Sequence, residues 1–237
     1  MRDAVEPGGI ASAVRHTIGP YTLFDRVRRE RCMRKWEHWS RVAPLVAAGA
    51  MLFFYGLLAL ATLHRYLETR SLNVFGLLVV NTTFLVMYAA RRDTTEVSRL
   101  TTAWALAFSG TFLPLLMRPT GSGPTSGFGD ALQLLGFVAI LAALWSLRRS
   151  FGIVPAHRGI RTTGMYRFVR HPLYAAELLT LAGAALAHPS VRNALLWFVE
   201  LAVQLGRTRA EETFLGRDPD YAHYVARVRY RLLPRIL

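Results

Sequence analysis

The 237-residue sequence is poor in lysine, cysteine and acidic residues. Its 29 basic residues include a single lysine, Lys35, and 15 acidic residues leave a formal net charge of +14. The single cysteine, Cys32, excludes an intramolecular disulfide framework, and no Cys/His cluster has the spacing of a metal site. A content of 52% hydrophobic residues excludes a disordered chain.

The sequence also lacks the short motifs of several large enzyme classes. It contains no G-x-G-x-x-G, no P-loop, no G-x-S-x-G and no H-E-x-x-H. The glycine-rich stretch 121–127 follows no predicted strand, so we interpret it as a flexible connector rather than a phosphate loop. These absences exclude a Rossmann cofactor domain and remove the main support for a hydrolase or an ATPase.

Long hydrophobic runs alternate with arginine clusters along the chain. Runs 42–63, 72–90, 100–117 and 131–147 are each about long enough to cross a hydrocarbon layer roughly 30 Å thick. They are apolar on all sides, whereas helices of a soluble bundle would show polar stripes. Two shorter runs, 173–187 and 191–205, predict a helical hairpin that enters the membrane and returns. We predict an all-α, polytopic integral membrane protein with about six transmembrane helices.

The arginines predict the orientation of these helices. With six crossings, the two termini and the loops 91–99 and 148–172 share one side and hold nearly all basic residues. The opposite loops hold only Arg65, Arg70, Arg118 and Arg192. Basic residues accumulate in cytoplasmic loops, so we expect both termini to be cytoplasmic, in a cell inner membrane. We assign the charge to contact with the anionic cytoplasmic leaflet rather than to nucleic acid, and the preference for arginine suggests a bacterial genome.

Two flanking segments have amphipathic patterns. Segment 23–41 mixes Phe24, Trp36 and Trp39 with many arginines, which predicts a helix in the headgroup layer that anchors the chain. Binding of a partner is the alternative role. In the C-terminal tail, Tyr221 and Tyr224 follow helical spacing, and we expect this tail to pack against the membrane face.

Polar and aromatic residues gather after residue 148. Pro172 suits a first helical turn, and His171 before it would lie near free backbone N–H groups that attract anionic atoms. Arg207 and Glu211 are four residues apart and therefore share a helix face. The alternatives are a surface histidine and an ordinary exposed ion pair.

Two further carboxylates lie within apolar runs. Glu177 and Glu200 are each a few residues inside the hairpin helices, where a carboxylate is costly and normally faces a cavity or a partner. We predict that they converge with Glu211, Glu212 and His171 on one shallow pocket between lipid and cytosol. We interpret Asn81, in the second run, as a hydrogen-bonding contact between helices.

The run Thr163-Gly164-Met165-Tyr166-Arg167-Phe168-Val169-Arg170-His171-Pro172-Leu173-Tyr174, followed by Arg207 and Glu211-Glu212, resembles a known superfamily. It is similar to the C-terminal half of the isoprenylcysteine carboxyl methyltransferase and phospholipid methyltransferase superfamily. The ending with Tyr221, Tyr224, Val228, Arg231 and Pro234 is similar too. The resemblance extends from Arg148 to the end of the chain.

The resemblance implies a membrane methyltransferase that uses S-adenosylmethionine and releases S-adenosylhomocysteine on the cytoplasmic side. It implies cofactor contacts from Gly159, Ile160, Arg161, Tyr166, His171, Pro172, Leu173, Tyr174, Glu211 and Glu212. Arg207, with Glu211, would be catalytic, Arg207 by binding an anionic acceptor group. Ala176 stands where the superfamily usually has glycine, and Glu177 beside it is also unusual.

We accordingly divide the chain into a basic amphipathic segment (1–41), a four-helix transmembrane region (42–147) and a methyltransferase region (148–237). The favoured acceptor is a lipophilic or small carboxylate, such as an isoprenoid acid, which is ionised at neutral pH and needs no base. The alternative acceptor is a phospholipid amine or a thiol, which would need a base, and Glu177, Glu200 and Glu212 are the candidates. The other hypotheses are a non-catalytic protein that binds lipid and a membrane reductase. We expect no metal.

Overall fold

The computed structural model describes Val46 and residues 48–92, 94, 96–98, 100–119 and 126–234. The chain divides into two compact units, Met1–Gly49 and Ala50–Leu237, and the contacts below are within the second. The predicted amphipathic segment 23–41 and most of the connector 121–127 lie outside the described residues.

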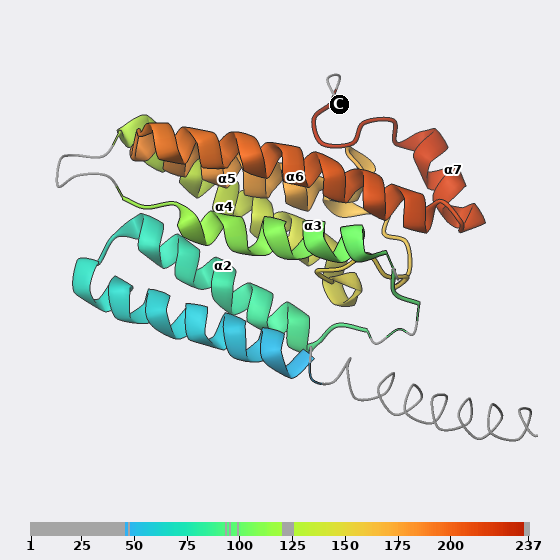
Figure 1. The fold of residues 1–237 in the computed structure, drawn as a ribbon, viewed down its shortest axis with the longest axis horizontal. Helices are drawn as coiled ribbons and strands as arrows, with labels where there is room; N and C mark the ends of the chain where they lie inside the picture. The colour runs from blue at the N-terminus through green and yellow to red at the C-terminus, as the bar shows by residue number, and fades with distance from the viewer. Residues whose placement is uncertain are drawn as a thin grey trace, which may run out of the picture. The chain divides into compact units, whose positions relative to one another are not determined.

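The described part of the chain is helical and contains no extended strand (Figure 1). The helix Ala48–Thr69 is followed by α2 (Leu72–Ala89), α3 (Thr101–Phe112) with the 3-10 turn η1 (Leu113–Leu116), and α4 (Gly127–Leu147) with η2 (Arg148–Ser150). After a long loop containing η3 (Gly164–Arg167) come α5 (Pro172–Ala187), α6 (Val191–Leu215) and α7 (Pro219–Arg227).

This architecture confirms the predicted all-α membrane class. The helix Ala48–Thr69, α2 and the helix Gly127–Ser150 are long and apolar enough to cross a membrane, and the helices Thr101–Leu116 and α5 are shorter and apolar. The number of crossings stays a prediction. Among the described residues, the first helix continues to Thr69, several residues past the predicted end of the run 42–63. α6 continues well past the predicted end at 205, because its last turns hold the polar residues that end the hydrophobic run.

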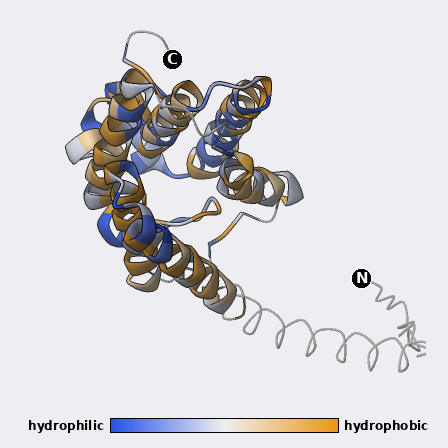
Figure 2. Cartoon of the chain, turned by 90° about the vertical axis from the view of Figure 1, so that its left-hand side faces the viewer, coloured by the Kyte–Doolittle hydropathy of each residue, from blue (hydrophilic) through white to orange (hydrophobic). Residues whose placement is uncertain are grey.

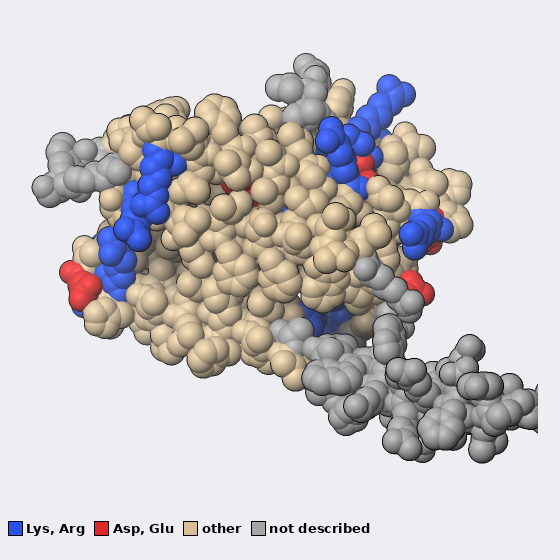
Figure 3. Space-filling view, viewed as in Figure 1, with Lys and Arg blue, Asp and Glu red and all other residues tan. Residues whose placement is uncertain are grey.

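The outward faces of these helices are apolar. Large hydrophobic side chains on three helices are 60–73% exposed: Phe53, Leu60, Val138, Trp145, Leu195 and Phe198. Figure 2 shows hydrophobic residues along most of the helices, and Figure 3 shows charged side chains mainly toward the two ends of the viewed face. Apolar surface of this extent marks contact with a membrane or partner, and the helices' length and composition favour a membrane.

Glycines bring α4 and α5 into the most extensive helix contact of the described residues. A methyl group at Gly136 would lie 2.3 Å from the Thr180 hydroxyl oxygen, and one at Gly183 would lie 2.3 Å from the Gln133 backbone nitrogen. Backbones can approach this closely only where side chains are absent. The contact therefore fixes α5, and with it the loop before α5, against α4.

The C-terminal tail packs against its own chain. Tyr221, Tyr224 and Val228 form a buried cluster with Ile160 and Leu215. The predicted amphipathic helix is thus present as α7, but its apolar face contacts the loop before α5 and the end of α6 rather than a membrane surface. The helical periodicity of the sequence predicts an apolar face, but it could not show whether that face contacts the rest of the chain or a membrane surface.

Candidate functional site

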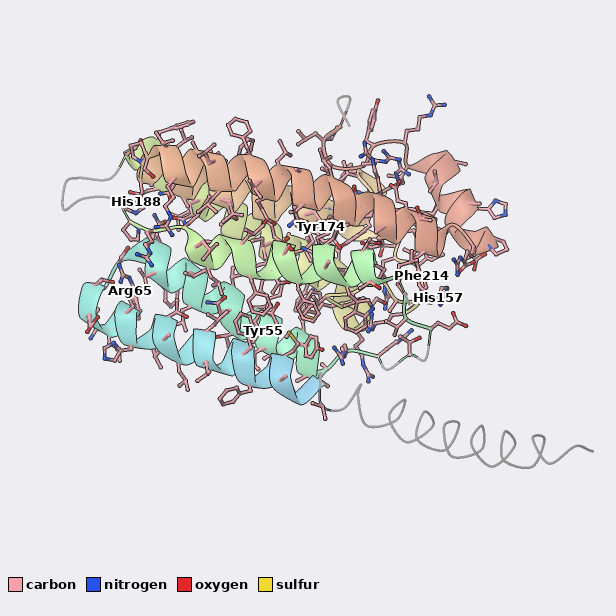
Figure 4. The ribbon with its side chains drawn as sticks, in the orientation of Figure 1. Tyr55, Arg65, His157, Tyr174, His188 and Phe214 are labelled. Atoms are coloured by element: carbon pink, nitrogen blue, oxygen red, sulfur yellow. The ribbon has the colours of Figure 1, made fainter. Side chains whose placement is uncertain are left out.

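A cavity of about 960 Å³ lies among the helices. Arg65, Arg118 and His188 line one part of it, and Gly159 and Glu211 line another. Figure 4 shows Arg65 and His188 near one end of the helices, Tyr174 in the middle and Phe214 near the other end. Because Arg65, His188, Tyr174 and Leu215, the residue after Phe214, line one cavity, it extends along much of the length of the helices.

Most of the predicted site residues line this cavity. They are Gly159, Ile160, Arg161, Tyr166, His171, Leu173, Tyr174, Arg207 and Glu211. The two exceptions among the described candidates are Pro172, which is buried at the start of α5, and Glu212, which lies behind His171. The cavity therefore brings together two segments, one before α5 and one near the end of α6, that are distant in the sequence.

The histidine–proline turn and the double-glutamate segment meet directly. His171 Nε2 lies 3.2 Å from Glu212 Oε1, and His171 Nδ1 lies 3.6 Å from Glu211 Oε2. The Tyr174 hydroxyl donates a hydrogen bond of 2.9 Å to Glu211 Oε2, and its ring stacks on that of His171. Glu211 is thus held at the cavity wall by two residues of the α5 start.

Glu212 connects three positively charged groups. Its carboxylate accepts a hydrogen bond of 2.9 Å from Arg231 Nε and lies 2.9 Å from Arg170 Nη1. It also contacts His171 Nε2, as described above. Two backbone hydrogen bonds, from Arg170 N to Tyr230 O and from His171 N to Arg231 O, hold the tail beside this loop. Glu212 therefore supports the site from outside the cavity.

The charges around His171 shift its pKa and that of Glu212 in opposite directions. Burial alone would lower the pKa of His171, but the hydrogen bonds to Glu211 and Glu212 outweigh burial and raise it. Burial alone would raise the pKa of Glu212, but the hydrogen bond with His171 and the charges of Arg170 and Arg231 lower it. The imidazolium and carboxylate forms stabilise each other.

Arg207 is buried, with 7% of its surface exposed, and its guanidinium already has several partners. It lies over the Tyr174 ring at 4.5 Å, donates to Gln204 Oε1 at 3.2 Å and lies 3.8 Å from Glu177 Oε2. A methyl group at Gly110 of α3 would lie 2.8 Å from Arg207 Nη1, so α3 passes close to this side chain. Arg207 faces the cavity as a neutralised rather than a free cation.

Gln204 joins the two carboxylates of the hairpin. Its amide donates hydrogen bonds of 2.8 Å to both Glu177 Oε2 and Glu200 Oε1. Gln204 and Glu200 are 0% and 1% exposed, and neither lines the cavity, whereas Glu177 does. Sequence analysis missed Gln204, although its position one turn after Glu200 and three residues before Arg207 was an available signal.

The loop before α5 needs two glycines with positive φ. Gly159 has φ of +86° and Gly164 has φ of +65°, and a methyl group at Gly164 would lie 2.3 Å from the Ser146 hydroxyl oxygen. The Tyr224 hydroxyl donates a hydrogen bond of 2.7 Å to Tyr166 O. The loop is thus fixed by α4 on one side and by α7 on the other.

As predicted, Asn81 joins two helices: its side-chain amide donates to the Thr62 hydroxyl oxygen at 3.2 Å. Both residues also line the cavity. Among the described residues, no group of three or more His, Cys, Asp or Glu side chains could hold a metal ion.

Residues 125–218 match the family model of phospholipid methyltransferases. This region of the chain is therefore similar to a domain of that family. The match confirms the resemblance seen in the sequence, because it includes the histidine–proline turn and the double-glutamate segment. It begins before α4, which the resemblance from Arg148 did not include, and it ends directly before α7. Comparison with curated proteins and with solved structures found no match.

The match of residues 125–218 to the phospholipid methyltransferase family model supports a membrane methyltransferase. The matched region contains α4, α5 and α6, the three helices whose contacts hold the polar part of the cavity. The helix Ala48–Thr69, α2 and α3 precede the matched region and close the rest of the cavity wall.

Proposed function

We propose that this chain is an S-adenosylmethionine-dependent methyltransferase whose acceptor is a lipophilic or small molecule that enters from the bilayer. The main support is one cavity with two chemical parts, whose polar part is lined by residues of the region that matches the phospholipid methyltransferase family. One part is lined by the polar residues of the histidine–proline turn and Glu211. The other is lined mostly by apolar side chains of the helices.

The polar part of the cavity fits the cofactor. Gly159 leaves open space, because a methyl group there would have only Arg92 Nη1 nearby, at 3.9 Å. Tyr166 and Tyr174 offer aromatic surface, and Glu211 offers a carboxylate for the cofactor's polar groups. When bound there, S-adenosylmethionine supplies a methyl group on a positively charged sulfur, and after transfer S-adenosylhomocysteine remains.

The chain's own contribution is alignment and exclusion of water. Methyl transfer from a sulfonium needs an in-line approach and loses charge in the transition state, so orientation in a dry site accelerates it. The α4–α5 contact through Gly136 and Gly183 fixes the α5 residues that line the cavity. An apolar cavity wall holds the acceptor beside them.

We further propose that the protein resides in a bacterial inner membrane, with the His171 end of the cavity at the cytoplasmic side. The arginine distribution supports this orientation, as does the attraction of arginine to anionic lipid of the cytoplasmic leaflet. Its partners in this proposal are lipids and the acceptor, rather than nucleic acid or a metal.

Calorimetry with S-adenosylhomocysteine on the detergent-purified full chain tests this proposal. We expect saturable binding by the parent protein and binding about 10- to 100-fold weaker in Glu211→Ala, since a hydrogen bond to a charged group contributes about 1.5–3 kcal/mol. The matched control is Glu68→Gln, whose carboxylate belongs to an exposed pair with His64. Absence of binding by the parent protein would overturn the proposed function.

A further inference from the structure

The cavity has a second group of polar side chains, at the end farthest from His171. His171 and His188 flank α5, and at a rise of about 1.5 Å per residue they lie about 25 Å apart along the helix. Figure 4 shows Arg65 and His188 near the same end of the helices. We call this part the far end of the cavity, and it is lined by Arg65, Ser71, Asn73, Arg118, Asp130 and His188.

The four arginines that line the polar part of the cavity each have a partner in the chain. They are Arg158, Arg161, Arg170 and Arg207, and their partners, in the same order, are Arg92 O, Ser150 Oγ, Glu212 and Glu177. Two carboxylates, Glu177 and Glu211, line the same part, and Glu211 contacts His171. Each guanidinium of the polar part therefore has a contact within the chain.

The two arginines of the far end differ from these four. Among the described residues, the side chains of Arg65 and Arg118 have no hydrogen-bond or ion-pair partner. Glu68, three residues after Arg65, belongs to the exposed pair with a histidine described above. Asp130 lines the far end, but its Oδ1 accepts a hydrogen bond from the Asn73 amide, and its place in the first turn of α4 favours a negative charge. Together these charges leave the far end positive.

The start of α2 adds backbone donors to the far end. Ser71 is the N-cap residue of α2, its side chain makes no capping hydrogen bond, and the first turn holds no acidic residue. The unpaired N–H groups at the start of a helix attract anions, and Ser71, Leu72 and Asn73 line the cavity. Asn73 Oδ1 is buried without a hydrogen-bond partner among the described residues, so a ligand hydroxyl group would find an acceptor there.

Asn193 fixes the backbone on both sides of the far end. This residue is 2% exposed, and its side-chain amide donates hydrogen bonds to Arg118 O at 2.9 Å and to His188 O at 2.8 Å. Its Oδ1 accepts a hydrogen bond from Arg118 N at 3.4 Å. The backbone that carries Arg118 is thus held beside the end of α5, which reduces the entropy lost when a ligand binds.

These donors and the apolar residues beside them indicate the chemistry of a ligand. Two guanidinium groups and the N–H groups of a helix start suit a phosphate, because each guanidinium can donate two parallel hydrogen bonds to its oxygens. Leu72 and Leu115 line the cavity at this end and are 65% and 49% exposed. The far end therefore offers apolar contacts for an acyl chain next to its cationic groups.

We propose that the far end of the cavity is a phosphate-binding site that holds a membrane phospholipid by its headgroup. The lipid belongs to the leaflet opposite the polar part, and one of its acyl chains lies along the apolar lining. The site is separate from methyl transfer, because a phosphate there lies about 25 Å from His171. The bound lipid stabilises the folded protein, since a ligand that binds only the folded state shifts the unfolding equilibrium.

Calorimetry on the detergent-purified full chain with three probes tests this proposal. The probes are dioctanoyl phosphatidylglycerol, dioctanoylglycerol, which has the same chains without phosphate, and inorganic phosphate, which has no chain. We expect saturable binding of the phosphatidylglycerol. Dioctanoylglycerol should bind at least about tenfold more weakly because it cannot contact the arginines, and inorganic phosphate at least about tenfold more weakly because it buries no apolar surface.

Variants of the two arginines locate the site. Arg65→Gln and Arg118→Gln should each bind the phosphatidylglycerol about tenfold more weakly, and the double variant about 100-fold, since each loses hydrogen bonds to a charged group. The matched control is Arg70→Gln, whose guanidinium lies over the Tyr66 ring at 5.7 Å and does not line the cavity. This control should bind the lipid as the parent does.

Two further measurements separate loss of the site from loss of the fold. Both arginines are exposed, so the Tm of the double variant without added lipid should lie within about 2 °C of the parental value. Added phosphatidylglycerol should raise the Tm of the parent but not that of the double variant. If the double variant does not fold, the two single variants decide the matter by their smaller lipid-induced shifts.

Three outcomes would overturn the proposal. Binding of dioctanoylglycerol as strong as that of the phosphatidylglycerol would show an apolar site without phosphate recognition. Binding of inorganic phosphate with equal strength would assign the site to free phosphate rather than to a lipid. Parental lipid binding by the double variant would place the lipid elsewhere. Failure of the parent to bind S-adenosylhomocysteine would overturn the proposed function alone, because the far end lies outside the polar part of the cavity.

Discussion

Replacing Glu212 by glutamine should destabilise the protein strongly, although Glu212 does not line the cavity. The carboxylate is 11% exposed and contacts Arg170, Arg231 and His171 at 2.9–3.2 Å. Glutamine keeps the size but removes the charge and turns an NH₂ group toward cations. Removing one partner of a buried ion pair lowers the free energy of unfolding by about 3–5 kcal/mol. The ion pair with Arg231 adds little to this loss, because Arg231 is more exposed.

This cost corresponds to a lower melting temperature of about 10 °C, since 1 kcal/mol shifts Tm by about 2–4 °C in a chain of this size. The assay is thermal unfolding of the detergent-purified protein followed by circular dichroism. The control Glu68→Gln, whose pair with His64 is exposed, should change Tm by less than about 2 °C. A Glu212→Gln protein with a Tm within that same margin would refute the reasoning.

The pH dependence of the stability provides a second test of this prediction. The folded protein lowers the pKa of Glu212, so its stabilising effect is present above the unfolded-state value of 4.5 and is lost as the pH falls through the folded-state value. The difference in Tm between the parent and Glu212→Gln should therefore be full at pH 7 and shrink below about pH 4.5. A difference that stays constant down to pH 3 would show that the charge of Glu212 does not matter.

The remaining predictions concern packing and the neighbours of the site. Gly136→Ala should lower the free energy of unfolding by about 1–3 kcal/mol, because the added methyl group overpacks the contact with α5. Gly56 has open space around it, so Gly56→Ala should leave this stability unchanged or raise it, and thermal unfolding of the two variants tests the difference. His171→Gln should lower Tm most below about pH 6.5 and less as the pH rises, because the folded state raises the pKa of His171; equal losses at pH 6 and pH 9 would contradict this. Tyr224→Phe removes the hydrogen bond to Tyr166 O, so it should lower the free energy of unfolding by about 1–2 kcal/mol and weaken S-adenosylhomocysteine binding. Parental values in both assays would argue against fixation of the loop by α7.

Much of the fold could be predicted because it depends on local composition. The hydrophobic runs predict helices at nearly the observed bounds of α2 and α5, since a membrane span must satisfy its backbone hydrogen bonds internally. The end of α6 was harder to predict from the sequence. Its last turns are polar, and only their contacts with His171 and Tyr174 explain why the helix continues to Leu215.

The candidate site was predictable as a set of residue types but not as an arrangement. The histidine–proline turn and the double glutamate stand out in the sequence, and the structure brings them together as expected. The sequence could not show that Glu212 lies outside the cavity while Glu211 lines it. Adjacent helix residues point in directions about 100° apart, so the rotation of α6 against α5 decides which one faces the cavity.

The sequence by itself determined the membrane class, the helical segments and the family motif, because each depends on residues close together along the chain. The tertiary structure decided that Glu177 faces the cavity, that Glu200 is buried with a hydrogen bond from Gln204 and that Arg207 is already paired. The physical reason is that these roles depend on the rotation and spacing of helices. Contacts between distant positions, such as Gly183 with Gln133, set both.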